Sequence, residues 1–174
     1  LPIYDQVDER FNIEKATETA CRIIKDIYKK YNNWTLSVAA YDLGPGALDR
    51  QLERQGTLSY YELDLNDETA MYVYRLLAFK EIISRPEAYG YKLAKRDLYA
   101  PLATRAVKVD SSITDLSLFA ISQESDFLSL KALNPWLLKS SLENPDHKTY
   151  IILLPRKGVK LYGIETPDSV KLVP

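Results

Sequence analysis

Apolar residues recur at helical spacing over residues 13–31, with Lys and Asp between them. The recurring positions are Ala16, Ala20, Ile23, Ile24, Ile27 and Tyr31. A spacing of three or four residues predicts an amphipathic helix. Asn12 is a suitable N-cap, and Asn32-Asn33 breaks the pattern after the helix.

Three further helices follow. The segment from Trp34 to about Ala40 is almost continuously apolar, which predicts a helix buried on most sides. A turn at residues 41–46 precedes a third helix that stops at Gly56. In the fourth helix Asn66 is the predicted N-cap, acidic residues occupy the first turn, and Pro86 ends the helix.

The pattern changes after residue 90. Residues 105–109 alternate like a short strand, and the segments 112–122 and 127–133 read as helices, the first with Ser112 and Asp115 at capping-box spacing. An apolar run at 150–154 predicts a closing strand. We therefore divide the chain into a helical part at 1–90, a linker at 91–103, a strand–helix–helix–strand module at 104–156 and a tail at 157–174. The predicted fold class is mainly α, with a small α+β module.

Charge and composition argue against a nucleic-acid partner and against a metal site. The formal net charge is −1, so no global basic field indicates a nucleic-acid partner. The single cysteine, Cys21, is expected to be a small buried side chain. The single histidine, His147, lies in a predicted turn without cysteine or a second histidine nearby, so we expect neither a metal site nor any other cofactor. The chain starts Leu1-Pro2 without a signal-like segment, and we expect a processed product or a fragment.

Two segments carry a resemblance to a known family. The first is Trp34-Thr35-Leu36-Ser37-Val38-Ala39-Ala40-Tyr41-Asp42-Leu43-Gly44-Pro45-Gly46. It resembles a buried helix that runs into an Ala-Tyr-Asn-x-Gly-x-Gly turn in soluble-lytic-transglycosylase domains. The second is Glu68-Thr69-Ala70-Met71-Tyr72-Val73, followed by Pro86-Glu87-Ala88-Tyr89-Gly90. It resembles the family's Glu-Thr-x-x-Tyr-Val helix and the segment after it. Val7-Asp8-Glu9-Arg10 also fits, especially the membrane-bound D type.

The resemblance implies a partial lysozyme-like lobe from an enzyme that cleaves peptidoglycan glycan strands. Such enzymes break the bond between N-acetylmuramic acid and N-acetylglucosamine without water and leave a 1,6-anhydro end. One glutamic acid serves as general acid and then as general base. In the family this residue lies in a Glu-Ser motif ahead of the Val-Asp-Glu-Arg region. We therefore expect it upstream of Leu1, and we expect this chain to be inactive alone.

The resemblance assigns substrate-binding roles to Tyr41, Asp42, Gly44, Gly46 and Tyr72. Tyr41 and Tyr72 would lie beside the groove, although both could be core tyrosines. Asp42 stands where the family has Asn; an ionised Asp only accepts hydrogen bonds, so a sugar contact that needs a donor would be weakened. The two glycines would permit positive φ or the close approach of a glycan.

Two neighbouring features bear on the groove. Tyr60 and Tyr61 are possible groove residues. Glu124-Ser125 looks like the family's catalytic motif but follows the turn instead of preceding it, so we interpret it as a link between two helices.

Residues 104–156 resemble a LysM module, on Ile113 to Ala120, Leu128 to Trp136 and Tyr150 to Pro155. Such modules bind chains that contain N-acetylglucosamine, but the match is degenerate, so a sugar-binding and a packing role stay equally open. The expected partner is peptidoglycan in the bacterial envelope, periplasmic or associated with the outer membrane. Membrane attachment would come only from an upstream anchor, and the oligomeric state stays open. The alternatives are a non-catalytic peptidoglycan-binding or scaffold protein and an interaction module without a sugar ligand.

Overall fold

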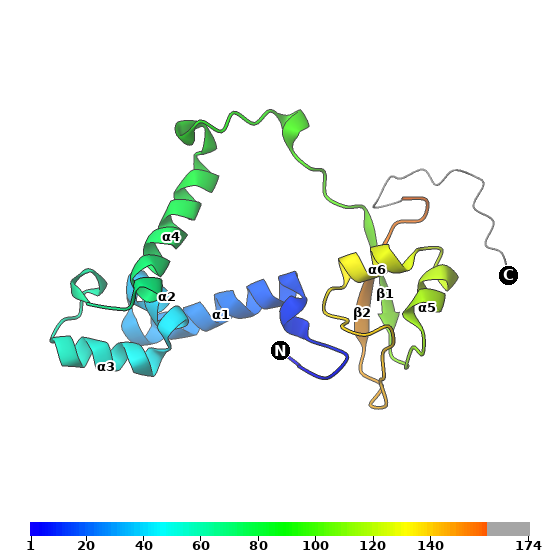
Figure 1. Ribbon diagram of the computed structural model, residues 1–174, viewed down its shortest axis with the longest axis horizontal. Coiled ribbons are helices and arrows are strands. Elements are labelled where there is room, and N and C mark those ends of the chain that lie inside the picture. Colours follow the sequence, from blue (N-terminus) through cyan, green and yellow to red (C-terminus); the bar gives the residue numbers. More distant parts are fainter. Residues whose placement is uncertain (160–174) are drawn as a thin grey trace. The chain divides into compact units, whose positions relative to one another are not determined.

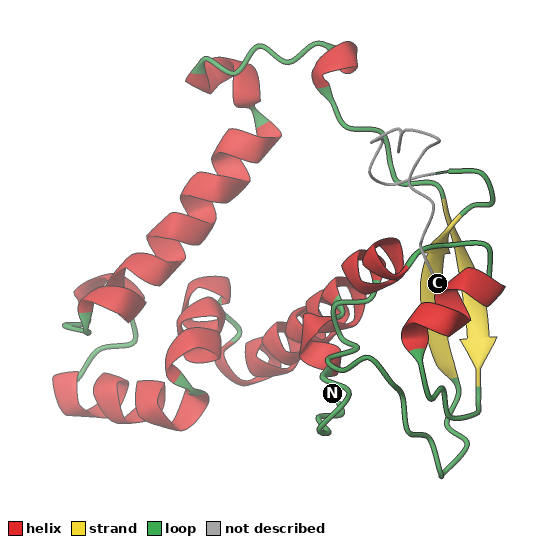
Figure 2. Cartoon of the chain, turned by 45° about the vertical axis from the view of Figure 1, so that its right-hand side comes forward, coloured by secondary structure: helices red, strands yellow, loops and turns green. Residues whose placement is uncertain are grey.

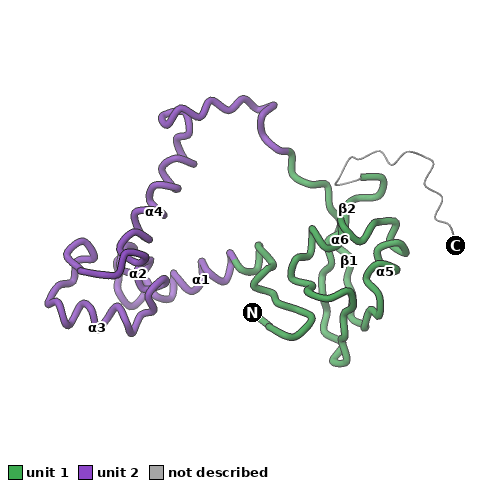
Figure 3. The backbone as a smooth tube through the Cα atoms, viewed as in Figure 1, with its two compact units in different colours: residues 1–16, 100–174 green, residues 17–99 purple. Residues whose placement is uncertain are grey.

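The computed structural model describes residues 1–159 and is mainly α-helical with one small sheet, as predicted (Figure 1). Two compact units make up the chain. One contains residues 17–99, and the other contains residues 1–16 together with residues from 100 onward (Figure 3). The predicted tail, 157–174, lies outside the described residues from position 160 on.

The secondary structure is coloured in Figure 2. The helices are α1 (Ile13–Tyr31), α2 (Trp34–Leu43), α3 (Pro45–Gln55), α4 (Asp67–Ser84), α5 (Leu116–Ser122) and α6 (Phe127–Leu133). The strands are β1 (Thr104–Val109) and β2 (Tyr150–Pro155), and short 3-10 helices cover Glu9–Phe11, Tyr60–Glu62, Pro86–Tyr89 and Lys95–Asp97. The predicted helices and strands are therefore confirmed, except at two boundaries: α5 begins later than predicted, and α2 and α3 extend into the segment predicted as a turn, so that only Gly44 separates them.

The helical unit is built around α2. Asn33 caps this helix, because its side-chain oxygen accepts a hydrogen bond from the Leu36 N–H at 3.0 Å. The side chains of α2 pack against α3 and α4. The core so formed consists of Leu36, Ala39, Ala40, Leu48, Leu52, Tyr60 and Val73. A helix that is apolar on most sides is thus buried on most sides, as expected.

Helix α4 begins as predicted, with the Asn66 side chain accepting from the Thr69 N–H at 3.0 Å. Only Thr69 and Val73 of this helix are buried. Several apolar side chains on its later turns are exposed to solvent, among them Leu76, Leu77, Phe79 and Ile83. The helix therefore presents apolar surface to solvent within the described part of the chain.

The second unit pairs β1 with β2 in antiparallel register, with Val107 opposite Ile152. Helices α5 and α6 pack beside this sheet, and α6 contacts β2 (Figures 1 and 2). The core is formed by apolar side chains from both strands, both helices and the long loop before β2. Its members include Val109, Leu116, Ala120, Leu130, Leu137, Leu142, Ile152 and Leu154.

The first residues of the chain belong to this second unit. Val7 is 2% exposed and is part of its core. Backbone bridges pair Ile3 with Asp8 and Val7 with Leu137. We call residues 3–8 the strap. The sequence division grouped these residues with the helical part of the chain, whereas in the structure they pack into the β-containing unit.

Two expectations were wrong. Helix α5 begins at Leu116 and not at Ser112, because Ile113 forms a β-bridge with Leu142 and keeps the chain extended. Asp115 is the N-cap, accepting from the Ser117 and Leu118 N–H groups. Cys21 is exposed, because it lies one position away from the half-buried stripe that includes Ala20 and Ile24.

Candidate functional site

The candidate substrate residues of the first motif lie where α2 runs into α3. Tyr41 is 36% exposed and Asp42 is half-buried, both in the last turn of α2. Gly44 has φ +90° and ends this helix, while Pro45 begins α3. A side chain at Gly44 would meet no atom within 4 Å, so glycine is required here by its backbone conformation and not by space.

Gly46 differs from Gly44. Among residues 1–159, the glycines with positive φ are Gly44, Gly56, Gly90 and Gly158, so Gly46 does not adopt the positive φ that was one of its two expected roles. Gly46 lies in the first turn of α3, and an added Cβ would meet only the Arg50 guanidinium at 3.8 Å. That separation is ordinary van der Waals contact, so only the close approach of a ligand would demand glycine at this position.

Tyr72 comes from α4, which packs against α2. Burial raises the pKa of the Tyr72 phenol above its ordinary value, and the charges of Tyr41 and Asp42 raise it further. This coupling places the three side chains in one electrostatic neighbourhood. Tyr72 therefore stays a neutral phenol at ordinary pH and can both donate and accept a hydrogen bond.

Tyr60 is only 5% exposed, and its hydroxyl donates to the carbonyl oxygens of Thr69 and Ala70 at 2.9 and 2.7 Å. Burial raises its pKa, with Tyr74, Tyr61 and Asp42 adding to the shift against a backbone hydrogen bond from Val73. A tyrosine with a satisfied hydroxyl in the core is a structural residue.

Tyr61 and Tyr74 are the exposed members of the same aromatic group. Tyr61 is 61% exposed and Tyr74 is 47% exposed, and their ring centroids lie 6.2 Å apart. Such a pair offers flat apolar faces to solvent. From the sequence, Tyr61 was proposed as a groove residue but Tyr74 was not. Tyr74 lies two residues after Tyr72 in a helix, so these two side chains are predicted to point in different directions.

Several described carboxyl groups are held in their charged form, the opposite of what a general acid requires. Glu124 occupies the link between α5 and α6 with φ +54°, and the Lys157 ammonium that pairs with it lowers its pKa. Glu68 lies exposed in the first turn of α4. Among residues 1–159, the carboxyls whose pKa departs from its ordinary value are all shifted downward: Asp8, Asp26, Asp49, Glu124 and Asp126.

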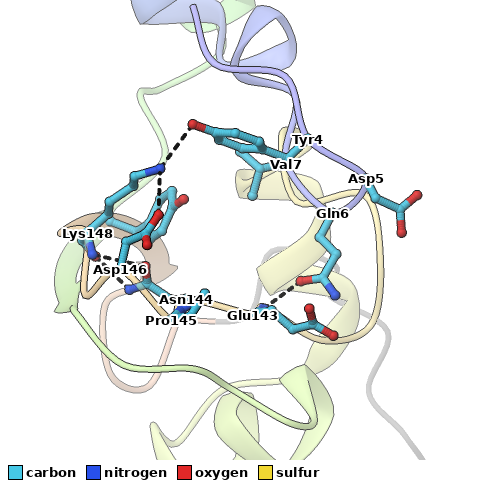
Figure 4. A pocket seen from close by; sticks show the side chains of 10 residues that line it. Tyr4, Asp5, Gln6, Val7, Glu143, Asn144, Pro145, Asp146 and Lys148 are labelled. Carbon is cyan, nitrogen blue, oxygen red and sulfur yellow. Dashed lines mark hydrogen bonds and ion pairs between the residues drawn. The ribbon is translucent and has the colours of Figure 1, made fainter.

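Three cavities lie elsewhere in the two units. One of about 660 Å³ borders α3 and includes Tyr31 and Leu58, and one of about 530 Å³ runs along β1 and α5. The third has about 280 Å³ and is formed by the strap and the loop before β2 (Figure 4). Its lining residues are Tyr4, Asp5, Gln6, Val7, Glu143, Asn144, Pro145, Asp146, Lys148 and Tyr150. Neither Tyr41 nor Tyr72 lines any of the three.

Residues 1–159 contain no group of three or more His, Cys, Asp or Glu side chains arranged for a metal ion. His147 lies in a turn with φ +50°, and its Nδ1 is 3.0 Å from the Asp110 carbonyl oxygen. None of the described helices combines the length and apolar character needed to cross a bilayer.

Comparison with known proteins gives two family matches. Residues 1–63 match the transglycosylase SLT domain, and residues 105–158 match the soluble lytic transglycosylase C-terminal LysM-like domain. Two curated relatives are the membrane-bound lytic murein transglycosylase D of Escherichia coli strain K12 and that of strain CFT073 (O6:H1). Each is 29% identical over 101 residues, which is 55% of this chain and 22% of the relative.

These matches confirm the resemblance to lytic transglycosylases and to a LysM-like module that the motifs predicted. The chain spans 22% of the length of the relatives it matches. The strap falls inside the SLT match at residues 1–63, yet its Val7 side chain lies in the core of the LysM-like unit.

Proposed function

We propose that this chain is the distal part of a peptidoglycan lytic transglycosylase. Residues 1–90 would belong to its lysozyme-like lobe, residues 91–103 would be the linker and residues 104–156 would be the LysM-like module. One observation carries the proposal: an SLT match and the LysM-like domain of soluble lytic transglycosylases occur in one chain, in that order. The relatives named as murein transglycosylases support the same assignment.

The reaction needs one glutamic acid. As general acid it protonates the oxygen that leaves the muramic acid anomeric carbon, and the glycosidic bond breaks. The sugar's own primary hydroxyl then bonds to the anomeric carbon and returns a proton to the carboxylate, so no water is consumed. We expect this glutamic acid in the segment that carries the Glu-Ser motif in this family.

The residues of this chain would form the distal wall of the groove. Tyr41 would hold substrate or orient the acid with its hydroxyl, and the neutral phenol of Tyr72 would do the same from α4. Asp42 would accept hydrogen bonds from sugar hydroxyls. Gly44 would keep the turn open, and Gly46 would let a glycan approach the start of α3. Tyr61 and Tyr74 would offer stacking faces nearby.

The partner in this proposal is the glycan strand of peptidoglycan. The relatives' names place such activity at murein, so the bacterial envelope is the expected location, either periplasmic or at the outer membrane.

The test is digestion of purified sacculi with the full-length parent protein. The expected products are muropeptides that end in anhydro-muramic acid, identified by mass spectrometry. Reducing ends in their place would show hydrolysis and overturn the proposal. This chain alone, incubated in parallel, should release no product, because the catalytic acid is expected outside it.

A second candidate is a non-catalytic peptidoglycan-binding or scaffold protein. The observation that favours it is Asp42, which replaces an amide donor with an acceptor in the turn that matches the family motif. It predicts retention of the chain on sacculi together with an inactive full-length parent. A parent protein that yields anhydro products would exclude it, and so would a chain that is not retained.

A further inference from the structure

The LysM-like unit holds an extended peptide from its own chain. We infer that its surface at residues 136–143 is a peptide-docking groove and that the strap, residues 3–8, is its occupant. The inference does not depend on the proposed enzymatic function, because it rests on contacts within one compact unit.

The anchor of the strap is Val7. This side chain is 2% exposed and packs in one core with Trp136, Leu137 and Leu142, which are 4%, 0% and 0% exposed. Ile3, in the same strap, is 54% exposed. Among the apolar side chains of the strap, burial is thus concentrated at Val7, as in extended peptides that place a single apolar side chain into a pocket.

Backbone pairing fixes the register of the strap. The Asp8 N–H donates to the Trp136 carbonyl at 2.9 Å, and the Leu138 N–H donates to the Gln6 carbonyl at 2.8 Å. These two bonds enclose the bridge between Val7 and Leu137. Alternating hydrogen bonds on the two sides of a bridged pair are the pattern of strand addition.

Side chains of the strap residues before Val7 add further contacts (Figure 4). The Gln6 side-chain oxygen accepts from the Glu143 N–H at 2.5 Å. Tyr4 accepts from the Lys148 ammonium at 3.0 Å, and that ammonium lies 4.7 Å from the Tyr4 ring centroid. The docked strap therefore contacts side-chain as well as backbone groups of the loop before β2.

The strap is also shaped by its own turn. The Tyr4 N–H donates to the Val7 carbonyl at 2.7 Å, and the Val7 N–H donates back to the Tyr4 carbonyl at 3.3 Å. The Asp8 carboxylate, 3% exposed as a residue, accepts from the Arg10 guanidinium at 2.6 to 3.1 Å. A segment held in its bound shape loses less conformational entropy on docking.

The consequence concerns what the LysM-like unit does. The strap, which completes the core of the LysM-like unit, lies within the SLT match at residues 1–63 and not within the LysM-like match at 105–158. With the strap docked, Trp136, Leu137 and Leu142 are buried, whereas the Leu138 side chain stays exposed. The unit thus serves as a docking module for the strap.

The experiment releases the strap from the groove of the full chain and tests whether an added peptide binds there in its place. Val7→Asp puts a carboxylate at a buried apolar position and should release the strap. A labelled peptide of residues 1–12, added in trans and followed by fluorescence anisotropy, should then bind at least about tenfold more tightly to the Val7→Asp chain than to the wild type, in which the tethered strap competes. Ile3→Asp is the matched control, since Ile3 is exposed, and it should bind peptide no better than wild type.

A peptide that itself carries Val7→Asp should lose this binding. If the Val7→Asp chain stays folded, equal affinity of the peptide for it and for the wild-type chain, including no binding to either, would overturn the inference. Hydrogen exchange then covers the case in which Val7→Asp unfolds the whole unit. In the milder Val7→Ala chain the Leu138 amide should exchange about tenfold faster while the amides of the β1–β2 pairing keep their rates. A uniform rise, or no rise at Leu138, would equally contradict the inference.

Discussion

The side chain of Asn134 pairs with the backbone of Leu153 in both directions. Its Nδ2 donates to the Leu153 carbonyl at 2.7 Å, and its Oδ1 accepts from the Leu153 N–H at 2.8 Å. The same Nδ2 also donates to the Leu130 carbonyl at 2.7 Å. Asn134 is 0% exposed, so this one amide ties the end of α6 to β2 inside the core.

Replacement of Asn134 by Leu should therefore destabilise the LysM-like unit strongly. The change keeps the volume but leaves backbone groups at Leu153 and Leu130 without their side-chain partner, which should cost about 3 kcal/mol of unfolding free energy. Urea denaturation followed by circular dichroism measures the loss. Leu138→Ala, at a side chain 44% exposed, is the control and should change stability by less than about 0.5 kcal/mol.

The contrast between Asn134 and the helix caps shows what the sequence could predict. Asn33 and Asn66 act on backbone groups three residues away, so their roles follow from local pattern. The local pattern at Asn134 predicts no more than the end of a helix, because its partner Leu153 lies 19 positions away. The start of α5 was misplaced for the same reason, since the bridge from Ile113 to Leu142 is a long-range contact.

Tyr60→Phe should cost about 1 kcal/mol of stability in the helical unit. The variant keeps the ring in the core but removes the hydroxyl that donates to the carbonyls of Thr69 and Ala70. Equilibrium unfolding in urea gives the value. Tyr61→Phe alters an exposed side chain of the same aromatic group and should be neutral; a Tyr60→Phe chain as stable as Tyr61→Phe would show that the hydroxyl is not needed.

The raised pKa values of Tyr60 and Tyr72 predict a loss of stability at alkaline pH. A group whose folded pKa lies above its unfolded value contributes stability that is present below the unfolded pKa, about 10 for tyrosine, and is lost as pH rises through the folded pKa. Wild type should therefore lose more stability between about pH 9 and pH 11 than the double variant Tyr60→Phe, Tyr72→Phe. Identical pH slopes would refute the prediction. Lysines contribute equally to both chains and cancel in this comparison.

At the acid end, the hydrogen bonds that Arg10 donates to Asp8 lower the pKa of that carboxyl below its ordinary value. A lowered folded pKa contributes stability that is present above the unfolded pKa of 3.8 and is lost as pH falls through the folded pKa. Asp8→Asn should flatten this acid limb, as seen in pH titration of the unfolding midpoint. Asp5→Asn, at a side chain 85% exposed, is the control and should leave the limb unchanged.

The apolar side chains on α4 predict self-association of the isolated chain. Leu76, Phe79 and Ile83 follow one edge of the helix at spacings of three and four, and they are 38%, 67% and 74% exposed. Sedimentation velocity should show a concentration-dependent increase in mass. The double variant Phe79→Lys, Ile83→Lys should shift the chain toward monomer, whereas Lys80→Glu should not. A wild-type chain that stays monomeric at high concentration would show that this surface does not drive association.

The candidate site was only partly predictable. The motif order in the sequence selected Tyr41, Asp42 and Tyr72 from two helices, and their role at a groove stays a prediction; Tyr41 and Asp42 both raise the pKa of Tyr72. Tyr60 and Tyr61 are neighbours in a short 3-10 helix and point in different directions. The sequence alone does not say which of the two side chains is buried. Their exposure distinguishes them: the Tyr60 side chain is buried in the core, and the Tyr61 ring faces solvent.

Asp42 offers the sharpest test of the proposed groove. If the turn contacts a sugar carbonyl or acetamido oxygen, Asp42→Asn supplies the missing donor and should increase retention of the chain on purified sacculi by about threefold to tenfold. Tyr41→Ala, which removes the aromatic face and the hydroxyl together, should decrease retention by a similar factor. Asp67→Asn is the matched control, since Asp67 is an exposed first-turn charge on α4, and it removes the same charge elsewhere. A rise in retention for both Asn variants would mean that lower net charge alone favours binding. A rise for Asp42→Asn alone would place a hydrogen-bond acceptor of the glycan at this turn.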